Sequence, residues 1–178
     1  MCDKEISKFI NSFAPWLSGI GAMLAVIVSL YLTRRDRNIR LAITATVSDL
    51  ISPGSAETEK VITIDITNIG LRTATVVSIF WQAGILKKQN FIMIYSDHPL
   101  SHNLPKEIKD GEKALIIHPM ESFFATNRET FSEVFKKHFI KTKLRYFRVG
   151  TYTTTGKLVR CKVSKPLREI FLKELKNT

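Results

Sequence analysis

The chain has 178 residues, of which 27 are Lys or Arg and 16 are Asp or Glu, so its formal net charge is +11 at pH 7. Hydrophobic residues make up 44% of the chain and aromatic residues 10%, which excludes an intrinsically disordered protein. Two cysteines are too few for a fold built on disulfides. The length and composition predict one ordinary domain with a short additional segment.

A long uncharged stretch lies near the N-terminus. Residues 9–33 carry no charged side chain, and residues 16–32 are almost all apolar or small. Because a hydrocarbon core about 30 Å thick needs roughly 20 helical residues, we predict a transmembrane helix over residues 14–33. A cleaved signal peptide is the alternative, but basic residues follow the stretch where a small-x-small cleavage site would stand. A buried core helix is a further alternative, which the length of the uncharged run disfavours.

Residues 1–13 form a short segment ahead of this stretch. Its apolar side chains fall at positions i, i+3, i+4 and i+7, namely Ile6, Phe9, Ile10 and Phe13. That spacing predicts an amphipathic segment in the membrane interface, or else the first turns of the spanning helix. In both cases the segment serves anchoring.

The charges that flank the stretch predict its orientation. A basic segment over residues 34–40 follows it and contains four arginines: Arg34, Arg35, Arg37 and Arg40. On the other side, two lysines are offset by two acidic residues. Since Lys and Arg are retained in the cytoplasm, we expect a single-pass protein with its N-terminus outside and its C-terminal domain cytoplasmic.

Small residues recur every four positions within the predicted span, at Gly21, Ala25 and Ser29. Small residues at this spacing let two membrane helices approach closely. The pattern predicts a homo-oligomer formed through the transmembrane helix, or it reflects the ordinary abundance of small residues in such helices.

After Arg40 the apolar period changes from helical to two, which is typical of half-buried strands. Turn residues such as Thr155 and Gly156 separate successive segments of this kind. We predict strands near residues 39–47, 62–67, 74–81, 90–95, 113–118, 144–153 and 157–163. Strands at this spacing favour an antiparallel β-sandwich over residues 41–178, a length sufficient to bury its own core.

Two helices are expected within this domain. Thr126 and Glu129 have the spacing of a capping box, which predicts an inserted helix from about residue 126 to 138 with an apolar stripe. Ser164 is placed to cap a C-terminal helix, whose apolar stripe comprises Leu167, Ile170, Phe171 and Leu175. We expect both stripes to be buried in the core.

Several strand and turn segments together resemble those of a known group of proteins. They are the apolar span with its arginine-rich flank, residues 61–70 running into 73–78, Leu104-Pro105, residues 109–112 and residues 153–157. The chain resembles a loose group of bacterial and prophage-type membrane-anchored proteins with an immunoglobulin-like β-sandwich. This resemblance implies a bacterial inner-membrane protein with a role such as superinfection exclusion or phage defence. The chain departs from the immunoglobulin pattern because it has no paired core cysteines.

The positive charge is concentrated at the C-terminal end. Residues 41–135 hold 8 basic and 11 acidic side chains, whereas residues 136–178 hold 13 basic and 2 acidic ones. A basic run with interleaved aromatics contains Lys136, Lys137, Lys141, Lys143, Arg145 and Arg148. Three interpretations stay open: a solvated surface, contact with anionic lipid, or binding of nucleic acid or an acidic protein.

No catalytic, cofactor or metal motif stands out. Residues 150–157 resemble a phosphate-binding loop, but the glycine spacing is wrong and a strand is predicted to follow where a helix is needed. His98 and His102 with Asp97 would supply only part of a metal site. Lone His118, His138 and Cys161 are interpreted as structural or solvated residues.

The sequence therefore favours a non-enzymatic, membrane-anchored interaction module that contacts an unknown protein partner and needs no cofactor or metal. The alternative is a membrane-tethered binder of nucleic acid or anionic lipid that uses the basic run at residues 136–148.

Overall fold

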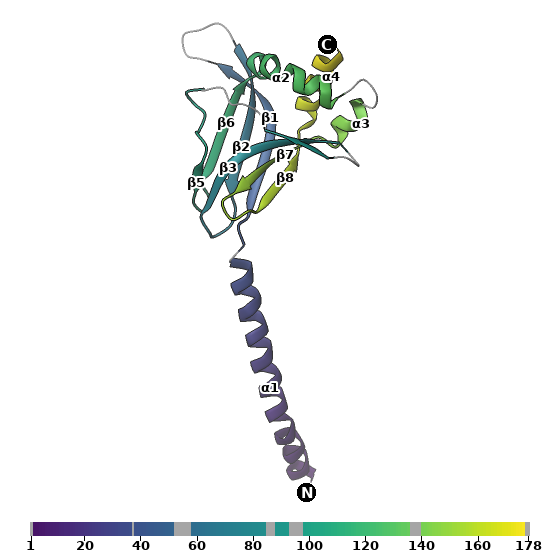
Figure 1. Ribbon diagram of the computed structural model, residues 1–178. Coiled ribbons are helices and arrows are strands. Elements are labelled where there is room, and N and C mark those ends of the chain that lie inside the picture. Colours follow the sequence, from purple (N-terminus) through teal and green to yellow (C-terminus); the bar gives the residue numbers. More distant parts are fainter. Residues whose placement is uncertain are drawn as a thin grey trace. The chain divides into compact units, whose positions relative to one another are not determined.

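The computed structural model describes residues 2–36, 38–51, 58–84, 88–92, 98–135 and 140–176 (Figure 1). The chain divides into two compact units, Met1–Asn38 and Ile39–Thr178. The first is helical, and the second contains two antiparallel sheets with several helices. The expectation of a mainly β protein with an N-terminal apolar helix is confirmed.

The first unit is one helix, α1, from Cys2 to Asp36. Its segment Pro15–Arg35 is long and apolar enough to cross a membrane. Residues 2–13, expected as an amphipathic segment, are part of the same continuous helix. The helix ends where Asn38 donates from its backbone N to the Arg35 carbonyl (3.3 Å) and from its side chain to the Arg34 carbonyl (3.1 Å). These bonds satisfy carbonyls that a helix end leaves without partners.

The first sheet of the β domain has the strand order β1-β2-β6. Its strands are β1 (Leu41–Ile51), β2 (Thr58–Asn68) and β6 (Lys113–Pro119). The start of β1 is buried at alternate positions, at Leu41, Ile43 and Ala45, as the period of two predicted. In β2 the isoleucines at 62, 64 and 66 are fully buried against the second sheet's core residues.

The second sheet has the order β4-β3-β7-β8, and β5 also pairs with β3. Its strands are β3 (Ala74–Ala83), β4 (Gln89–Phe91), β5 (Lys106–Ile108), β7 (Arg148–Thr153) and β8 (Leu158–Lys162). Sequence analysis missed β5, which has only three residues. The predicted strand at 90–95 corresponds in part to β4, and residues 93–97 lie outside the described residues.

The turn between β7 and β8 explains one glycine of the apparent phosphate-binding loop. Gly156 has φ +74°, and its N donates to the Thr153 carbonyl, which closes the hairpin. The other glycine lies within β7. A Cβ at Gly150 would lie 2.7 Å from the Val159 carbonyl oxygen and against the ring of Phe80. Both glycines therefore meet backbone requirements of a hairpin.

Three helices lie together at one end of the domain (Figure 1): α2 (Met120–Val134), α3 (Ile140–Arg145) and α4 (Lys165–Lys176). Their apolar faces close over an aromatic cluster around Trp81 of β3. The Trp81 ring lies 5.1 Å from Phe147, 5.7 Å from Phe123 and 5.9 Å from Phe171. These rings fix the helices to the sheets, since aromatic pairs at such distances add to the gain from burial.

The predicted start of the inserted helix is wrong. The helix begins at Met120, directly after β6, and its N-cap residue is Pro119, which provides no side-chain cap. Thr126 and Glu129 therefore lie inside the helix. Burial of Phe123 and Phe131 against the aromatic cluster outweighs the local capping signal.

Two further predictions at the C-terminal end need correction. The strand expected from residue 144 starts at Arg148, because Leu144 belongs to the short helix α3 and is buried there. Ser164 does precede α4 and its carbonyl accepts from the Arg168 N (3.1 Å), but its buried hydroxyl makes no hydrogen bond. Ser164 therefore occupies the cap position without a side-chain cap.

Candidate functional site

The strand register defines two opposite ends of the β domain. At one end, Leu41 pairs with Asn68, and Val76 pairs with Thr153. At the other end, Ile51 pairs with Thr58, and Gln82 pairs with Arg148. Ten residue steps along β1 separate these ends by about 33 Å. We call the second end, where α2, α3 and α4 lie, the helix end.

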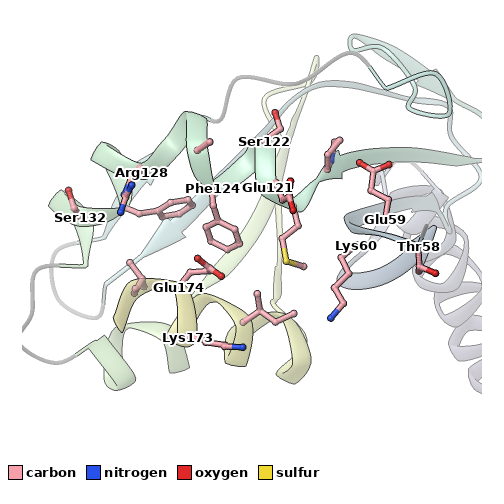
Figure 2. Close-up of a pocket in the computed structure, with 16 residues that line it drawn as sticks. Thr58, Glu59, Lys60, Glu121, Ser122, Phe124, Arg128, Ser132, Lys173 and Glu174 are labelled. Atoms are coloured by element: carbon pink, nitrogen blue, oxygen red, sulfur yellow. The ribbon is translucent and has the colours of Figure 1, made fainter. Parts of the chain in front are cut away.

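A groove of about 1060 Å³ crosses the helix end between α2, α4 and the start of β2. Figure 2 shows the Phe124 ring in the space between the two helices. The apolar part of the lining includes four half-buried side chains, Met120, Phe124, Ile170 and Leu175. The structure therefore leaves apolar side chains accessible between two helices that each bury another face in the core.

The floor of the groove is held by the aromatic cluster. The Phe124 ring lies 4.9 Å from Phe171 and 5.8 Å from Phe131, and both of these partners are buried. Because the partners are fixed in the core, the exposed side of Phe124 presents a preformed surface.

Charged side chains of both signs surround the groove and belong to β2, α2 and α4. Three are acidic and three are basic: Glu59, Glu121, Glu174, Lys60, Arg128 and Lys173 (Figure 2). Their formal charges cancel. The groove thus differs from the C-terminal segment of the chain, where basic residues dominate.

The first three residues of β2, Thr58–Lys60, also border the groove. They pair with β1, whereas the pairing of β6 with β2 ends at the Val61–Pro119 pair. Sequence analysis did not identify this groove. Part of its lining, Ile170 and Leu175, was predicted to be core, and nothing in the sequence indicated that β2 would extend past β6.

The basic run divides into residues with different environments. Lys141 and Arg145 are exposed on α3, and Arg148 is half-buried in β7. Lys143 is half-buried and its Nζ donates to the Val134 carbonyl at the end of α2 (2.8 Å). That bond gives Lys143 a structural role at a helix C-terminus. Lys136 and Lys137 lie outside the described residues.

The residues predicted to pack membrane helices lie on α1. Gly21, Ala25 and Ser29 are all exposed, and a Cβ at Gly21 would meet no atom within 4 Å. Arg34 and Arg35 are exposed in the last turn of α1. Arg40 is exposed just before β1, and Arg37 lies outside the described residues.

The rings of His98 and His102 accept hydrogen bonds from backbone groups. His98 Nδ1 accepts from the Leu100 N (3.2 Å), and His102 Nδ1 accepts from the Leu115 N (3.0 Å). Asp97 and His138 lie outside the described residues. Among the residues that the structure describes, no group of three or more His, Cys, Asp or Glu is placed to hold a metal ion.

Burial shifts the pKa of two side chains, buried His118 and half-buried Cys161. It lowers the pKa of His118 to about 4 and raises the pKa of Cys161 to about 11. His118 pairs with Ile62 and its ring lies 5.8 Å from Phe123, so it belongs to the core beneath α2. Neither side chain lines the groove.

Comparisons with known proteins give no functional assignment. No family model matches the chain, and no curated protein matches it. A solved structure described as Northeast Structural Genomics Consortium target SoR45 is 11% identical, with 72% of this chain and 84% of that chain covered and a TM-score of 0.30. A similarity at this level carries no argument about fold or function.

Proposed function

We propose that the protein is a non-enzymatic, membrane-anchored interaction module that binds a segment of a protein partner in the groove at the helix end. The observation that carries this proposal is the preformed groove of about 1060 Å³ with its apolar floor and its rim of balanced charge. Concave apolar surfaces with a few polar groups are the usual binding sites of proteins.

The chemistry of the groove favours a short amphipathic protein segment. Half-buried Phe124, Ile170 and Leu175 accept an apolar side-chain stripe, as helix-in-groove recognition requires. The three carboxylates and three cations of the rim fit a segment that carries charges of both signs. A polyanion fits poorly, because it would meet the three carboxylates.

We also propose that the domain is an immunoglobulin-like sandwich. The orders β1-β2-β6 and β4-β3-β7-β8 correspond to the A-B-E and C′-C-F-G strands of that fold. Trp81, 1% exposed on β3, takes the place of the buried tryptophan on strand C. The helices α2 and α3 are then an insertion between E and F.

The location proposed is the inner membrane of a bacterium, with α1 as a single span and the β domain in the cytoplasm. Support comes from the apolar segment Pro15–Arg35 and from the arginines that follow it. A role in superinfection exclusion or phage defence rests on the resemblance described above. An alkaline-phosphatase fusion after Thr178 is expected to be inactive, and high activity there would contradict the orientation.

Self-association through α1 is part of the same proposal. If Gly21, Ala25 and Ser29 form a contact between two copies, Ala25→Leu should reduce dimerisation in a membrane two-hybrid assay and leave insertion unchanged. Leu24→Ala, a change at a neighbouring exposed position, serves as control. If the parent and Ala25→Leu associate equally, these three small residues do not form a contact between two copies.

Site-specific photo-crosslinking tests the groove. A photoreactive residue at Ala125, exposed in the groove, should give a defined protein adduct in native membranes. The same residue at Thr126, exposed on α2 but outside the groove, should not. Peptide mapping should identify an amphipathic segment, and Ile170→Asp should abolish the adduct. Equal adducts at both positions would contradict the proposal.

A second candidate function is binding of nucleic acid or anionic lipid through the basic run. The favouring observation is that Lys141 and Arg145 are exposed on the same short helix. Replacing both with Glu should remove salt-sensitive binding of DNA or anionic vesicles. If the variant binds as well as the parent, or if the parent does not bind at low salt, the basic run is only solvated surface.

A further inference from the structure

The end of the β domain opposite the helix end is formed by four short segments, which we call the tip. They are residues 39–40, 68–73, 109–113 and 154–157. The register joins them, because Leu41 pairs with Asn68, Thr67 with Lys113 and Val76 with Thr153. The tip therefore contains the point where the chain enters the domain from α1.

Two large apolar side chains project from the tip. Ile69 is 60% exposed and Leu71 is 70% exposed, and both belong to the loop between β2 and β3. The residues around them turn inward, since Asn68 and Gly70 are buried. This loop therefore exposes two large apolar side chains to solvent while it buries Asn68 and Gly70.

Hydrogen bonds hold the loop in this conformation. The Asn68 side chain donates to the carbonyls of Arg72 (2.7 Å) and Ile108 (3.0 Å), and its Oδ1 accepts from the Gly70 N (3.0 Å). The Ile69 N donates to the Arg40 carbonyl (2.9 Å). Because a buried side chain organises it, the exposure of Ile69 and Leu71 is a fixed feature of the fold.

The charge of the tip is positive. Its four segments contain five basic side chains and two acidic ones, and all seven are exposed: Arg40, Arg72, Lys109, Lys113, Lys157, Asp110 and Glu112. The Lys157 Nζ also donates to the Ile39 carbonyl, which joins the β7–β8 turn to the entry of the chain. Exposed apolar residues within a basic ring match an anionic lipid surface.

Only a short connection lies between the last residue of α1 and the first residue of the tip. Asp36 ends the helix and Ile39 begins the β domain, so three Cα steps separate them, about 11 Å when extended. The helix end lies about 33 Å further along β1. If α1 spans the membrane, the tip is the part of the domain that the connection holds at the bilayer surface.

We infer that the tip is a lipid-docking surface, in which Ile69 and Leu71 enter the headgroup region of an anionic leaflet and the surrounding basic side chains contact its phosphates. This inference rests on the membrane anchoring in the proposed function but not on the groove. It assigns lipid contact to the tip instead of the basic run, whose described residues belong to α3 and to the start of β7 at the helix end.

The test uses the full chain in phosphatidylcholine vesicles with and without phosphatidylglycerol. In a Cys2→Ser, Cys161→Ala background, an environment-sensitive fluorophore is attached at Leu71→Cys, at Ile51→Cys or at Ile27→Cys, an exposed position on the face of α1 opposite Ala25. Ile51 is the matched control, because it is 75% exposed and lies at the opposite end of β1. Quenching by headgroup-level spin-labelled lipid and the emission wavelength are measured for each site.

The inference predicts a blue-shifted, several-fold more quenched label at position 71 than at 51 when phosphatidylglycerol is present. The difference should shrink without the anionic lipid and after Ile69→Asp. Equal quenching at 71 and 51, whether high or low, overturns the inference. The label at position 27, measured with lipid quenchers placed along the acyl chain, reports anchoring separately: quenching there with none at 71 rejects only the tip. A label at 27 that no such lipid quenches rejects both.

Discussion

The two ends of the β domain are stabilised by different kinds of interaction. The helix end is an aromatic cluster in which Phe171 lies 4.9 Å from Phe124 and 5.3 Å from Phe131. The tip is a set of turns held by backbone bonds and one buried asparagine. At the helix end a groove lies between α2, α4 and β2, whereas at the tip short loops expose Ile69 and Leu71. We propose on this basis that the two ends serve different contacts.

The largest effect is expected from breaking the aromatic cluster. Phe171→Ala removes a ring that is 0% exposed and contacts Trp81, Phe147 and Phe131. We expect the free energy of unfolding to fall by about 4 kcal/mol, measured by urea denaturation with near-ultraviolet circular dichroism. Ile51→Ala, at an exposed site, is the control and should change stability by less than about 0.5 kcal/mol. Similar losses for both would contradict the packing described here.

Acid should weaken the helix end through His118. Burial lowers the pKa of His118 to about 4, below its ordinary value of 6.5, so the unfolded chain binds the proton more readily. Neutral His118 contributes fully to the free energy of unfolding above pH 6.5. As the pH falls to 4, this contribution is lost and the free energy of unfolding decreases by about 3 kcal/mol. In His118→Leu this part of the pH dependence should disappear. An identical slope in the parent and the variant would show that His118 does not titrate in this range.

The conformation of the tip should depend on the side chain of Asn68. Asn68→Ala leaves the buried carbonyl of Ile108 without its donor and frees the Gly70 N, so we expect a loss of about 2 kcal/mol. The informative measurement is hydrogen exchange, which should speed up in residues 69–73 and 109–113 while α2 and α4 keep their protection. Uniform acceleration across the domain would mean that the two ends are not separately stabilised.

The smallest effect concerns the lysine that caps α2. Lys143→Met removes the bond to the Val134 carbonyl and should cost about 1 kcal/mol. Lys141→Met, at an exposed neighbouring position, should be close to neutral in thermal denaturation. If Lys141→Met destabilises as much as Lys143→Met, the difference drawn between these two residues of the basic run is wrong.

Sequence patterns predicted the strands well where one face is buried. The alternation from Leu41 to Val47 and the isoleucines of β2 dictate a half-buried strand in any context. The long apolar run of α1 is equally local. The start of α2 could not be predicted, because the burial of Phe123 under the sheets decides it and not the capping box at Thr126. Local signals fail where packing between distant segments sets the boundary.

The candidate sites were harder to predict from the sequence than the strands. The basic run was visible as a charge pattern, but only the fold separates Lys143, bonded to α2, from exposed Lys141. The groove combines β2, α2 and α4, which are far apart in the chain. The exposure of Ile69 and Leu71 was also hidden, because the buried Asn68 that turns the loop outward looks like an ordinary turn residue.

The central proposal is that the tip contacts the bilayer and the helix end binds a partner in solution. Energy transfer from a donor on the full chain to acceptor-labelled lipid headgroups tests it directly. In the Cys2→Ser, Cys161→Ala background, the donor is attached at Leu71→Cys in one sample and at Thr126→Cys in the other. We predict strong transfer from position 71 and weak transfer from 126, since the ends lie about 33 Å apart along β1. Equal transfer, or stronger transfer from position 126, would contradict the account.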